Sequence, residues 1–253
     1  IPEGARGRQF VAYFPVTDDV PQAFHAEHSM KFRTIAIAAV ALSALSAPSS
    51  GAQQTDTSYR QWEGDIRAFE HSDSVQKPPT KGILFVGSSS IRMWETLAQD
   101  FPDLPVINRG FGGSELHDIV HYANRVVLPY KPRVIVVYAG DNDLANGRKP
   151  EQVASDFRRL ARTVHRTLPR TRIVFVSVKP SPSRWNLVDR MRATNALVRR
   201  YARTDKRLAY ADIFTPMLGD DGRPRRELFR DDSLHMTPAG YELWTSVIRP
   251  YLR

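Results

Sequence analysis

Several short polar stretches in this sequence carry the residue types that nucleophilic catalysis needs. Three consecutive serines, 88–90, follow an apolar run, and a glycine-rich stretch covers 110–114. Asn142 lies in another polar stretch, and Asp232 stands three residues before His235. Acyl transfer uses this set of groups: a hydroxyl nucleophile, donors for an oxyanion, a base, and a residue that orients the base.

Each of these groups also has an ordinary structural role. The serines could cap a helix, and the glycines could form a tight turn. Asn142 could bond its own backbone in a turn, and a lone His235 could be structural. The residues therefore gain meaning only from the elements that position them.

Apolar runs and amphipathic stretches alternate from residue 83 onward. We expect strands at 83–87, 105–109, 133–139, 172–178 and 208–213, and helices at 90–100, 115–128, 150–168, 184–204 and 238–249. Strands that alternate with helices of this length predict right-handed crossovers and a parallel sheet. Loops that follow parallel strands emerge at one edge, so the polar stretches are expected to meet there. One three-layer α/β/α domain accounts for this part of the chain, with no separate cap domain.

The four polar stretches, taken in order, resemble the SGNH/GDSL hydrolase family of serine esterases. The matching blocks are Gly87-Ser88-Ser89, then Gly113 before Ser114, then Gly140-Asp141-Asn142-Asp143, and finally Asp232 with His235. The resemblance covers roughly residues 83–250. It implies a flavodoxin-like, five-stranded parallel sheet of order 2-1-3-4-5.

The resemblance also implies a role for each matched residue. Ser89 corresponds to the nucleophile, His235 to the base and Asp232 to the residue that orients it. The oxyanion donors correspond to the backbone of Ser89, the backbone of Gly113 and the side chain of Asn142. One departure is Ser88, which stands where the family usually has an acidic residue outside the triad.

We expect a two-step ester hydrolysis that needs no metal and no organic cofactor. His117 and His121 are spaced i, i+4 on one helix, but no acidic cluster at ligand spacing accompanies them, so we expect no metal site. Without a cap domain the site should be open, which favours short acyl groups, above all acetyl on carbohydrate. Residues expected to contact substrate are Arg109, Asp141 and Trp185.

Two alternatives remain open at this point. The chain could be a lysophospholipase or lipase-type acylhydrolase. It could also be a non-catalytic envelope- or carbohydrate-binding protein, because a fold does not determine a function. The expected partner is a small-molecule or polysaccharide ester.

The N-terminal part has the pattern of an export signal. A basic start at Met30 precedes a short apolar run and small residues, which is typical of a signal peptide over 30–52, cleaved at Ala47 or Ala52. We expect residues 1–29 to be an upstream extension, 53–80 an N-terminal helix and lead-in, and 81–253 the hydrolase domain. A secreted or periplasmic location follows, without a transmembrane span in the mature form.

Composition sets further limits. The 253-residue chain has no cysteine, which excludes disulfides, thiolate metal sites, a cysteine nucleophile and a lipid-modified N-terminal cysteine. The formal net charge is +9, and many of the arginines lie on expected helices. Such charge indicates non-specific affinity for anionic surfaces or polysaccharides, not specific recognition of nucleic acid.

Overall fold

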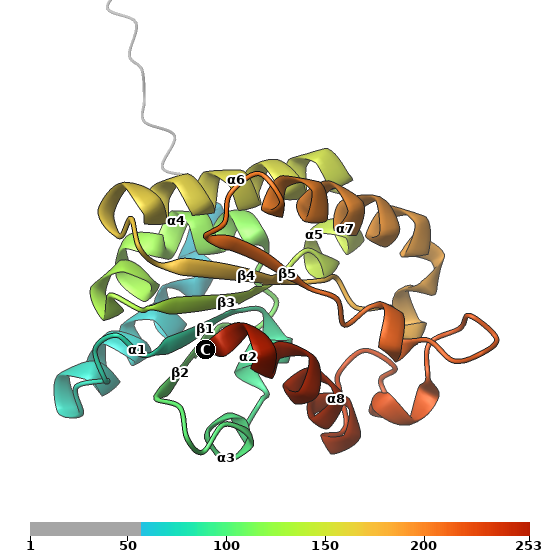
Figure 1. Cartoon of the computed structure of the whole chain (residues 1–253), viewed down its shortest axis with the longest axis horizontal. Helices are drawn as coiled ribbons and strands as arrows, with labels where there is room; N and C mark the ends of the chain where they lie inside the picture. Colours follow the sequence, from blue (N-terminus) through green and yellow to red (C-terminus); the bar gives the residue numbers. More distant parts are fainter. Residues whose placement is uncertain (1–56) are drawn as a thin grey trace, which may run out of the picture. The chain divides into compact units, whose positions relative to one another are not determined.

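Five parallel strands form the central sheet of the computed structural model, which describes residues 57–253 (Figure 1). The strands are β1 (Ile83–Gly87), β2 (Val106–Gly110), β3 (Val134–Tyr138), β4 (Arg172–Val176) and β5 (Leu208–Ala211). Their order is β2-β1-β3-β4-β5, so the expected parallel sheet and its order are confirmed. The proposed leader at 30–52 and the segment 1–29 lie outside the described residues.

The middle strands are apolar because both faces of the sheet are covered. Every residue of β1 and of β3 is buried, as continuous apolar runs in a parallel sheet predict. At the carboxyl end of the sheet, Gly87 pairs with Gly110 on one side and with Tyr138 on the other. The chain therefore leaves β1, β2 and β3 at the same level, and the loops after them are neighbours.

Helices cover both faces of the sheet. The longer ones are α1 (Glu63–Val75), α4 (Leu116–Val126), α6 (Pro150–Thr167), α7 (Val188–Ala202) and α8 (Pro238–Ile248). Three are one turn long, namely α2 (Ser89–Arg92), α3 (Leu97–Asp100) and α5 (Asp141–Ala145). Short 3-10 helices are η1 (Thr57–Trp62), η2 (Leu128–Tyr130), η3 (Pro182–Leu187), η4 (Thr215–Met217), η5 (Arg226–Leu228) and η6 (Arg249–Leu252).

Two hydrophobic cores result, one on each face. Buried side chains of α1, α4, α6 and α7 pack against one face of the sheet. Those of α2, α3 and α8 pack against the other. Within residues 57–253 no helix is both long and apolar enough to cross a bilayer.

The expectation of one continuous helix at 90–100 is wrong. The chain forms α2, a turn and α3, because the buried indole of Trp94 fills the core and its Nε1 donates to Asp100 (2.5 Å). The backbone of α2 also lies against β2, where a Cβ on Gly110 would stand 2.2 Å from the amide nitrogen of Arg92. A helix that continued straight from such a close contact would carry Trp94 away from its pocket.

The region after β4 also differs from the expected helix at 184–204. Arg184 has a non-helical backbone (φ −119°), so the chain runs through η3 before α7 starts at Val188. The short helix α5 after β3 was not expected, because its polar residues carry no helical periodicity. Both differences lie at the carboxyl edge of the sheet.

Candidate active site

The turn after β1 gives three adjacent serines three different environments. Ser88 precedes α2 with an extended backbone, and its N–H donates to the Tyr138 carbonyl on β3 (3.1 Å). Ser88 and Ser90 are buried, whereas Ser89, the first residue of α2, is partly exposed. Of the three hydroxyls, that of Ser89 is therefore the one presented at the carboxyl edge of the sheet.

His235 connects Ser89 to Asp232. The Nε2 atom of His235 lies 2.9 Å from the Ser89 Oγ, and its Nδ1 atom lies 2.6 Å from an Asp232 carboxylate oxygen. The other Asp232 oxygen accepts the backbone N–H groups of Leu234 and His235, each at 2.9 Å. Although partial burial opposes charge, these hydrogen bonds lower the pKa of Asp232 to about 2.

The loop that carries His235 is held by backbone hydrogen bonds at both ends. The N–H of Arg230 donates to the His235 carbonyl (2.7 Å), and Phe229 bridges to Met236. The N–H of Ser183, in η3, donates to the Ser233 carbonyl (3.1 Å). The histidine thus has a defined position although Asp232 is about half exposed to solvent.

Two backbone N–H groups, in the turns after β1 and β2, are unpaired within the described part of the chain. Among residues 57–253 no acceptor is found for the N–H of Ser89 or for that of Gly113. Gly113 has a left-handed backbone (φ +82°), a conformation that other residues adopt at a cost. The glycine therefore permits the turn that leaves this N–H unpaired.

Asn142 approaches the same loop from α5. Its Nδ2 donates one hydrogen to the Ser114 carbonyl (3.1 Å). The second Nδ2 hydrogen has no acceptor among residues 57–253. Its Oδ1 accepts from the Arg184 guanidinium (2.9 Å), which sets the orientation of the amide. The side chain of Asn142 can therefore act as a donor with a defined direction.

A buried charged cluster lies directly behind Asn142. The carboxylate of Asp141 accepts from Lys179 (2.7 Å) and lies 3.3 Å from Arg184. Lys179 also donates to Tyr138 (2.9 Å) and to Ser90 (3.1 Å). Burial opposes the charge of Asp141, but the two cations hold its pKa below the usual range.

Within this cluster Asp141 pairs with cations of the protein itself. No pattern in the sequence indicated its partner Lys179. Lys179 has no motif around it, and its partners are 38 to 89 positions away in the chain. We expected Asp141 to contact substrate. In the structure its carboxylate is buried and paired with Lys179. Its position next to Asn142 makes it part of the support of the site.

Asp143 fixes the start of α4 against α5. Its buried carboxylate accepts the backbone N–H of Leu116 at 3.1 and 3.2 Å. Burial raises the pKa of Asp143 to about 7, and the Leu116 N–H opposes the shift only in part. Asn142 and Asp143 thus hold the loop on either side of Glu115.

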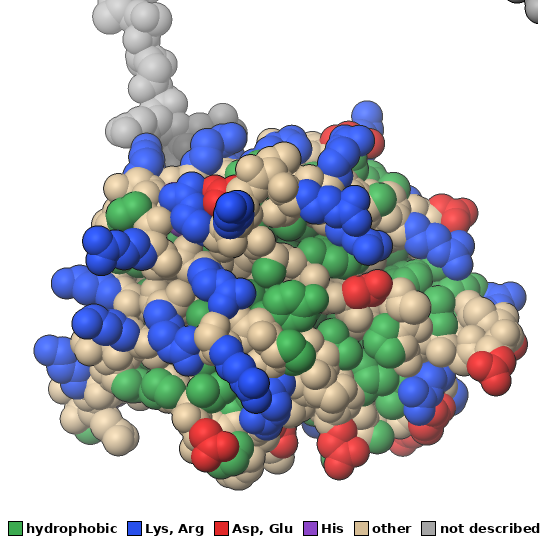
Figure 2. All heavy atoms as spheres, in the orientation of Figure 1, with side chains coloured by type: hydrophobic (Ala, Val, Ile, Leu, Met, Phe, Trp, Pro, Cys, Tyr) green, Lys and Arg blue, Asp and Glu red, His purple; other side chains and the backbone are tan. Residues whose placement is uncertain are grey.

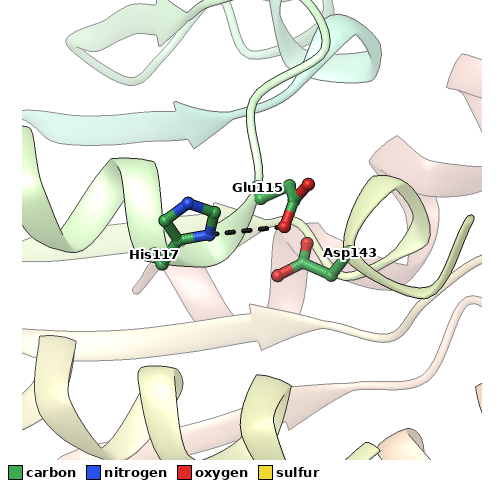
Figure 3. A group of neighbouring side chains, drawn as sticks. All are labelled: Glu115, His117 and Asp143. Carbon is green, nitrogen blue, oxygen red and sulfur yellow. Dashed lines mark ion pairs between the residues drawn. The ribbon is translucent and has the colours of Figure 1, made fainter. Parts of the chain in front are cut away.

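Glu115, His117 and Asp143 lie close enough to share a cation (Figure 3). The His117 ring is 3.3 Å from Glu115, as the dashed line shows. The Nε atom of Arg148, however, lies 3.6 Å from Glu115 and 3.7 Å from Asp143. Because a guanidinium lies beside both carboxylates, we interpret the group as an ion-pair cluster that supports the loop. His121 stacks on Tyr59 instead of joining His117.

The other two expected substrate contacts, Arg109 and Trp185, have partners within the protein. The guanidinium of Arg109 bonds to Asp73 on α1 and to the Tyr130 hydroxyl, so it ties α1 to the edge of the sheet. We therefore leave Arg109 out of the proposed site. The guanidinium groups of Arg192 and Arg223 lie over the Trp185 ring, 6.0 and 5.4 Å from its centroid.

The sequence of residues 81–243 matches the GDSL-like Lipase/Acylhydrolase family, and the chain belongs to this family. Membership identifies it as an enzyme of the carboxylic ester hydrolase class. A search of curated proteins found no match.

Solved structures share the fold at low sequence identity. A GDSL-like lipase from Bacteroides thetaiotaomicron aligns with a TM-score of 0.65 and 20% identity, covering 74% of this chain and 96% of that one. A family 3 carbohydrate esterase from Clostridium thermocellum aligns with a TM-score of 0.55 and 16% identity, covering 69% and 98%. A carbohydrate esterase family 3 protein from Talaromyces cellulolyticus gives 0.54 and 17%, covering 67% and 95%.

Proposed function

We propose that Ser89, His235 and Asp232 form a catalytic triad that hydrolyses short-chain carboxylic esters, with O-acetyl groups on carbohydrate as the natural substrate. The observation that carries the proposal is the continuous contact from hydroxyl to imidazole to carboxylate, 2.9 and 2.6 Å. Both distances are within hydrogen-bond range, as a nucleophile and its base require.

The proposed reaction proceeds in two steps. His235 Nε2 accepts the Ser89 proton as the oxygen attacks the acyl carbon, while the Asp232 carboxylate accepts a hydrogen bond from the Nδ1–H and stabilises the imidazolium. The N–H groups of Ser89 and Gly113 and the Asn142 amide bind the oxyanion. His235 then protonates the leaving alcohol, and a water molecule that it deprotonates attacks the acyl-enzyme.

The preference for short acyl groups rests on a neighbour of the oxyanion loop. The Cη2 atom of Trp62 lies 3.2 Å from the position that a Cβ on Gly113 would take, and the indole packs edge-on against Phe111. A bulky ring beside an oxyanion donor limits the space for the acyl chain. Acetyl fits such a site better than a fatty acyl chain does.

The preference for carbohydrate rests on similarity and on exposure. Two structures with this fold are named as carbohydrate esterases. In addition, the Asp232 side chain is 48% exposed, which indicates a site open to a large substrate. We also propose that residues 30–52 act as an export signal and that 81–253 form the hydrolase domain, in agreement with a substrate outside the cell.

The decisive test is a matched pair of serine variants assayed on p-nitrophenyl acetate. We expect Ser89→Ala to lower kcat by up to about 10⁶. Ser88→Ala should keep most of the activity, because the Ser88 hydroxyl is buried without a hydrogen-bond partner among the described residues. The opposite outcome would show that the nucleophile is Ser88.

A second experiment separates the proposed substrate from its alternatives. Release of acetate from acetylated xylan, compared with release of fatty acid from lysophosphatidylcholine, distinguishes a carbohydrate esterase from a lysophospholipase. A fluorophosphonate probe should label Ser89. No adduct and no turnover would indicate a binding protein on the same fold.

A further inference from the structure

Two adjoining hollows lie along α7 and the edge strand β5. Their volumes are about 470 and about 420 Å³. Both are lined by Arg199, Arg203, Tyr210 and Asp212, so they join into one groove. We call this feature the α7–β5 groove.

The groove is strongly basic. Five cationic side chains line it, and all are exposed: Arg192, Arg199, Arg200, Arg203 and Lys206. Its two carboxylates are engaged elsewhere, Asp205 with Arg207 and Asp212 with the N–H and hydroxyl of Thr215. Within residues 57–253 no ion pair is found for Arg199, Arg200, Arg203 or Lys206. Asp212 is the one lining carboxylate without a cationic partner among the described residues, so the five cations leave the groove with a net positive charge.

Apolar and aromatic groups lie between these cations. Tyr210 and Tyr251 line one part of the groove and Phe214 another. Figure 2 shows hydrophobic side chains across the middle of this face with Lys and Arg side chains around them. Aromatic rings and guanidinium groups together suit a chain of sugar rings that carries carboxylates, with the rings packed on the tyrosines and the acids paired with arginines.

The groove leads toward the proposed catalytic residues. Arg192, at one end, lies over the ring of Trp185 in η3. The residue before Trp185 is Arg184, which donates to the Asn142 amide. A polymer with its ester at Ser89 could therefore continue past η3 and along α7.

We propose that the α7–β5 groove binds an acidic polysaccharide and holds the polymer whose ester groups are cleaved at Ser89. The cations and aromatic residues favour a polyanion of sugar rings. The choice of polysaccharide among polyanions rests on the proposed function, because an acylated polysaccharide carries the charge and the ester on one molecule.

The test measures binding without turnover, in a Ser89→Ala background. The probes are polygalacturonate as the acidic polysaccharide, dextran as the neutral one and single-stranded DNA as another polyanion. We expect Arg199→Glu/Arg203→Glu to weaken polygalacturonate binding about tenfold or more. The control Arg162→Glu/Arg166→Glu makes the same charge change on exposed positions of α6 and should weaken it less than about threefold.

Three outcomes would overturn the proposal. The first is an equal loss in both double variants, which would show that net charge alone attracts the polymer. The second is tighter binding of DNA than of polygalacturonate. The third is a groove variant that leaves binding unchanged but dissociates a dimer, which would assign the groove to a second copy of the chain.

The same variants separate this proposal from the proposed function. With Ser89 restored, Arg199→Glu/Arg203→Glu should hydrolyse p-nitrophenyl acetate at the wild-type rate, because this small ester does not reach the groove. It should lose activity on O-acetylated polygalacturonate through a raised KM. If the wild type hydrolyses neither ester, the proposed function fails while the binding result stands on its own.

Discussion

At the residue scale, the serine turn shows how one backbone geometry separates three chemically identical side chains. Ser88 is buried with an unpaired hydroxyl, and Ser90 is buried with its hydroxyl accepting from Lys179. Only Ser89 combines exposure with a base at 2.9 Å. Reactivity therefore follows from position at the end of β1, since the three hydroxyls have the same intrinsic acidity.

Asn142 provides the first prediction at this scale. Asn142→Ala removes the one side-chain donor proposed for the oxyanion, so we expect kcat on p-nitrophenyl acetate to fall by about 10²–10³ with little change in KM. Steady-state kinetics measure both constants. A loss confined to KM would mean that Asn142 binds the substrate and does not stabilise the transition state.

Arg184 provides the second prediction, as a positioning residue. Arg184→Met leaves the Asn142 amide free to rotate, so we expect kcat to fall about tenfold, the equivalent of one hydrogen bond. The double variant Asn142→Ala/Arg184→Met should be no slower than Asn142→Ala, because Arg184 acts through the amide. Arg192→Met is the matched control and should leave kcat on this small ester unchanged. Additive losses in the double variant would contradict the positioning role.

At the element scale, the loop between β2 and α4 depends on contacts from α5. Asn142 bonds to Ser114 and Asp143 bonds to Leu116, so one turn of helix holds both sides of this loop. The Asp143 carboxyl has a pKa of about 7 in the folded state, above its ordinary value of 3.8. The folded state therefore binds more protons than the unfolded state between these two pH values.

This difference makes a prediction with a definite sign. Stability from Asp143 is fully present below about pH 4 and is lost as the pH rises to about 7. Asp143→Asn keeps an acceptor for Leu116 but cannot ionise. The quantity to follow is the unfolding free energy of the wild type minus that of the variant. This difference should decrease as the pH rises from 4 to 8, by on the order of 1.4 kcal/mol per unit of pKa shift. Urea denaturation across this range measures it, and a difference that is constant or rises with pH would contradict it.

The N-terminal helices supply another prediction at this scale. Trp62 belongs to η1, outside the part of the chain that matches the family, yet its ring stands beside Gly113. We expect Trp62→Ala to raise the ratio of activity on p-nitrophenyl hexanoate to activity on the acetate. Trp185→Ala removes the same side chain from η3 and should leave the ratio unchanged. An unchanged ratio in Trp62→Ala would place the acyl chain elsewhere.

The elements were largely predictable, and the contacts between them were not. The strands followed from apolar runs such as 83–87, because burial on both faces demands continuous hydrophobicity. The order of the sheet and the assignment of Ser89 came from a family resemblance, because periodicity carries no information on strand order. The break between α2 and α3 escaped prediction because it depends on Trp94 packing against residues distant in the chain, such as Tyr241, on the same face of the sheet.

Long-range polar contacts explain the remaining misses. We expected Arg109 to contact substrate because it stands at the end of the expected strand 105–109, but its partner Asp73 lies 36 positions earlier in the chain. Nothing in the sequence singled out Lys179, but it lies buried between Asp141, Tyr138 and Ser90. Pairs of this kind leave no local pattern, so only the folded structure reveals them.

At the scale of the whole molecule, the sheet couples two separate hydrophobic cores. Along β3, Val137 faces the core of α4, α6 and α7, while Tyr138 faces the core of α8. Adjacent residues of a strand point to opposite faces, so loss of one core removes support from the strands that form the other. The residues that carry Ser89 and His235 lie on the α8 side, and their geometry thus depends on both layers.

This coupling predicts a single unfolding transition. Phe157→Ala empties part of the first core, where Phe157 packs against Phe175, and Trp244→Ala empties part of the second, where Trp244 packs against Tyr138. Each side chain is fully buried, so each variant should lose about 3–5 kcal/mol of unfolding free energy.

In calorimetry, each of the two variants should show one transition at a lower temperature, because neither core can melt while the shared strands remain ordered. Val75→Ala, at a side chain that is 77% exposed, is the control and should change stability by less than about 0.5 kcal/mol. Two separate transitions, of which only one moves in each variant, would mean that the layers unfold independently. In that case Trp244→Ala alone would abolish ester hydrolysis at temperatures where the first core is still folded, which an activity melt would detect.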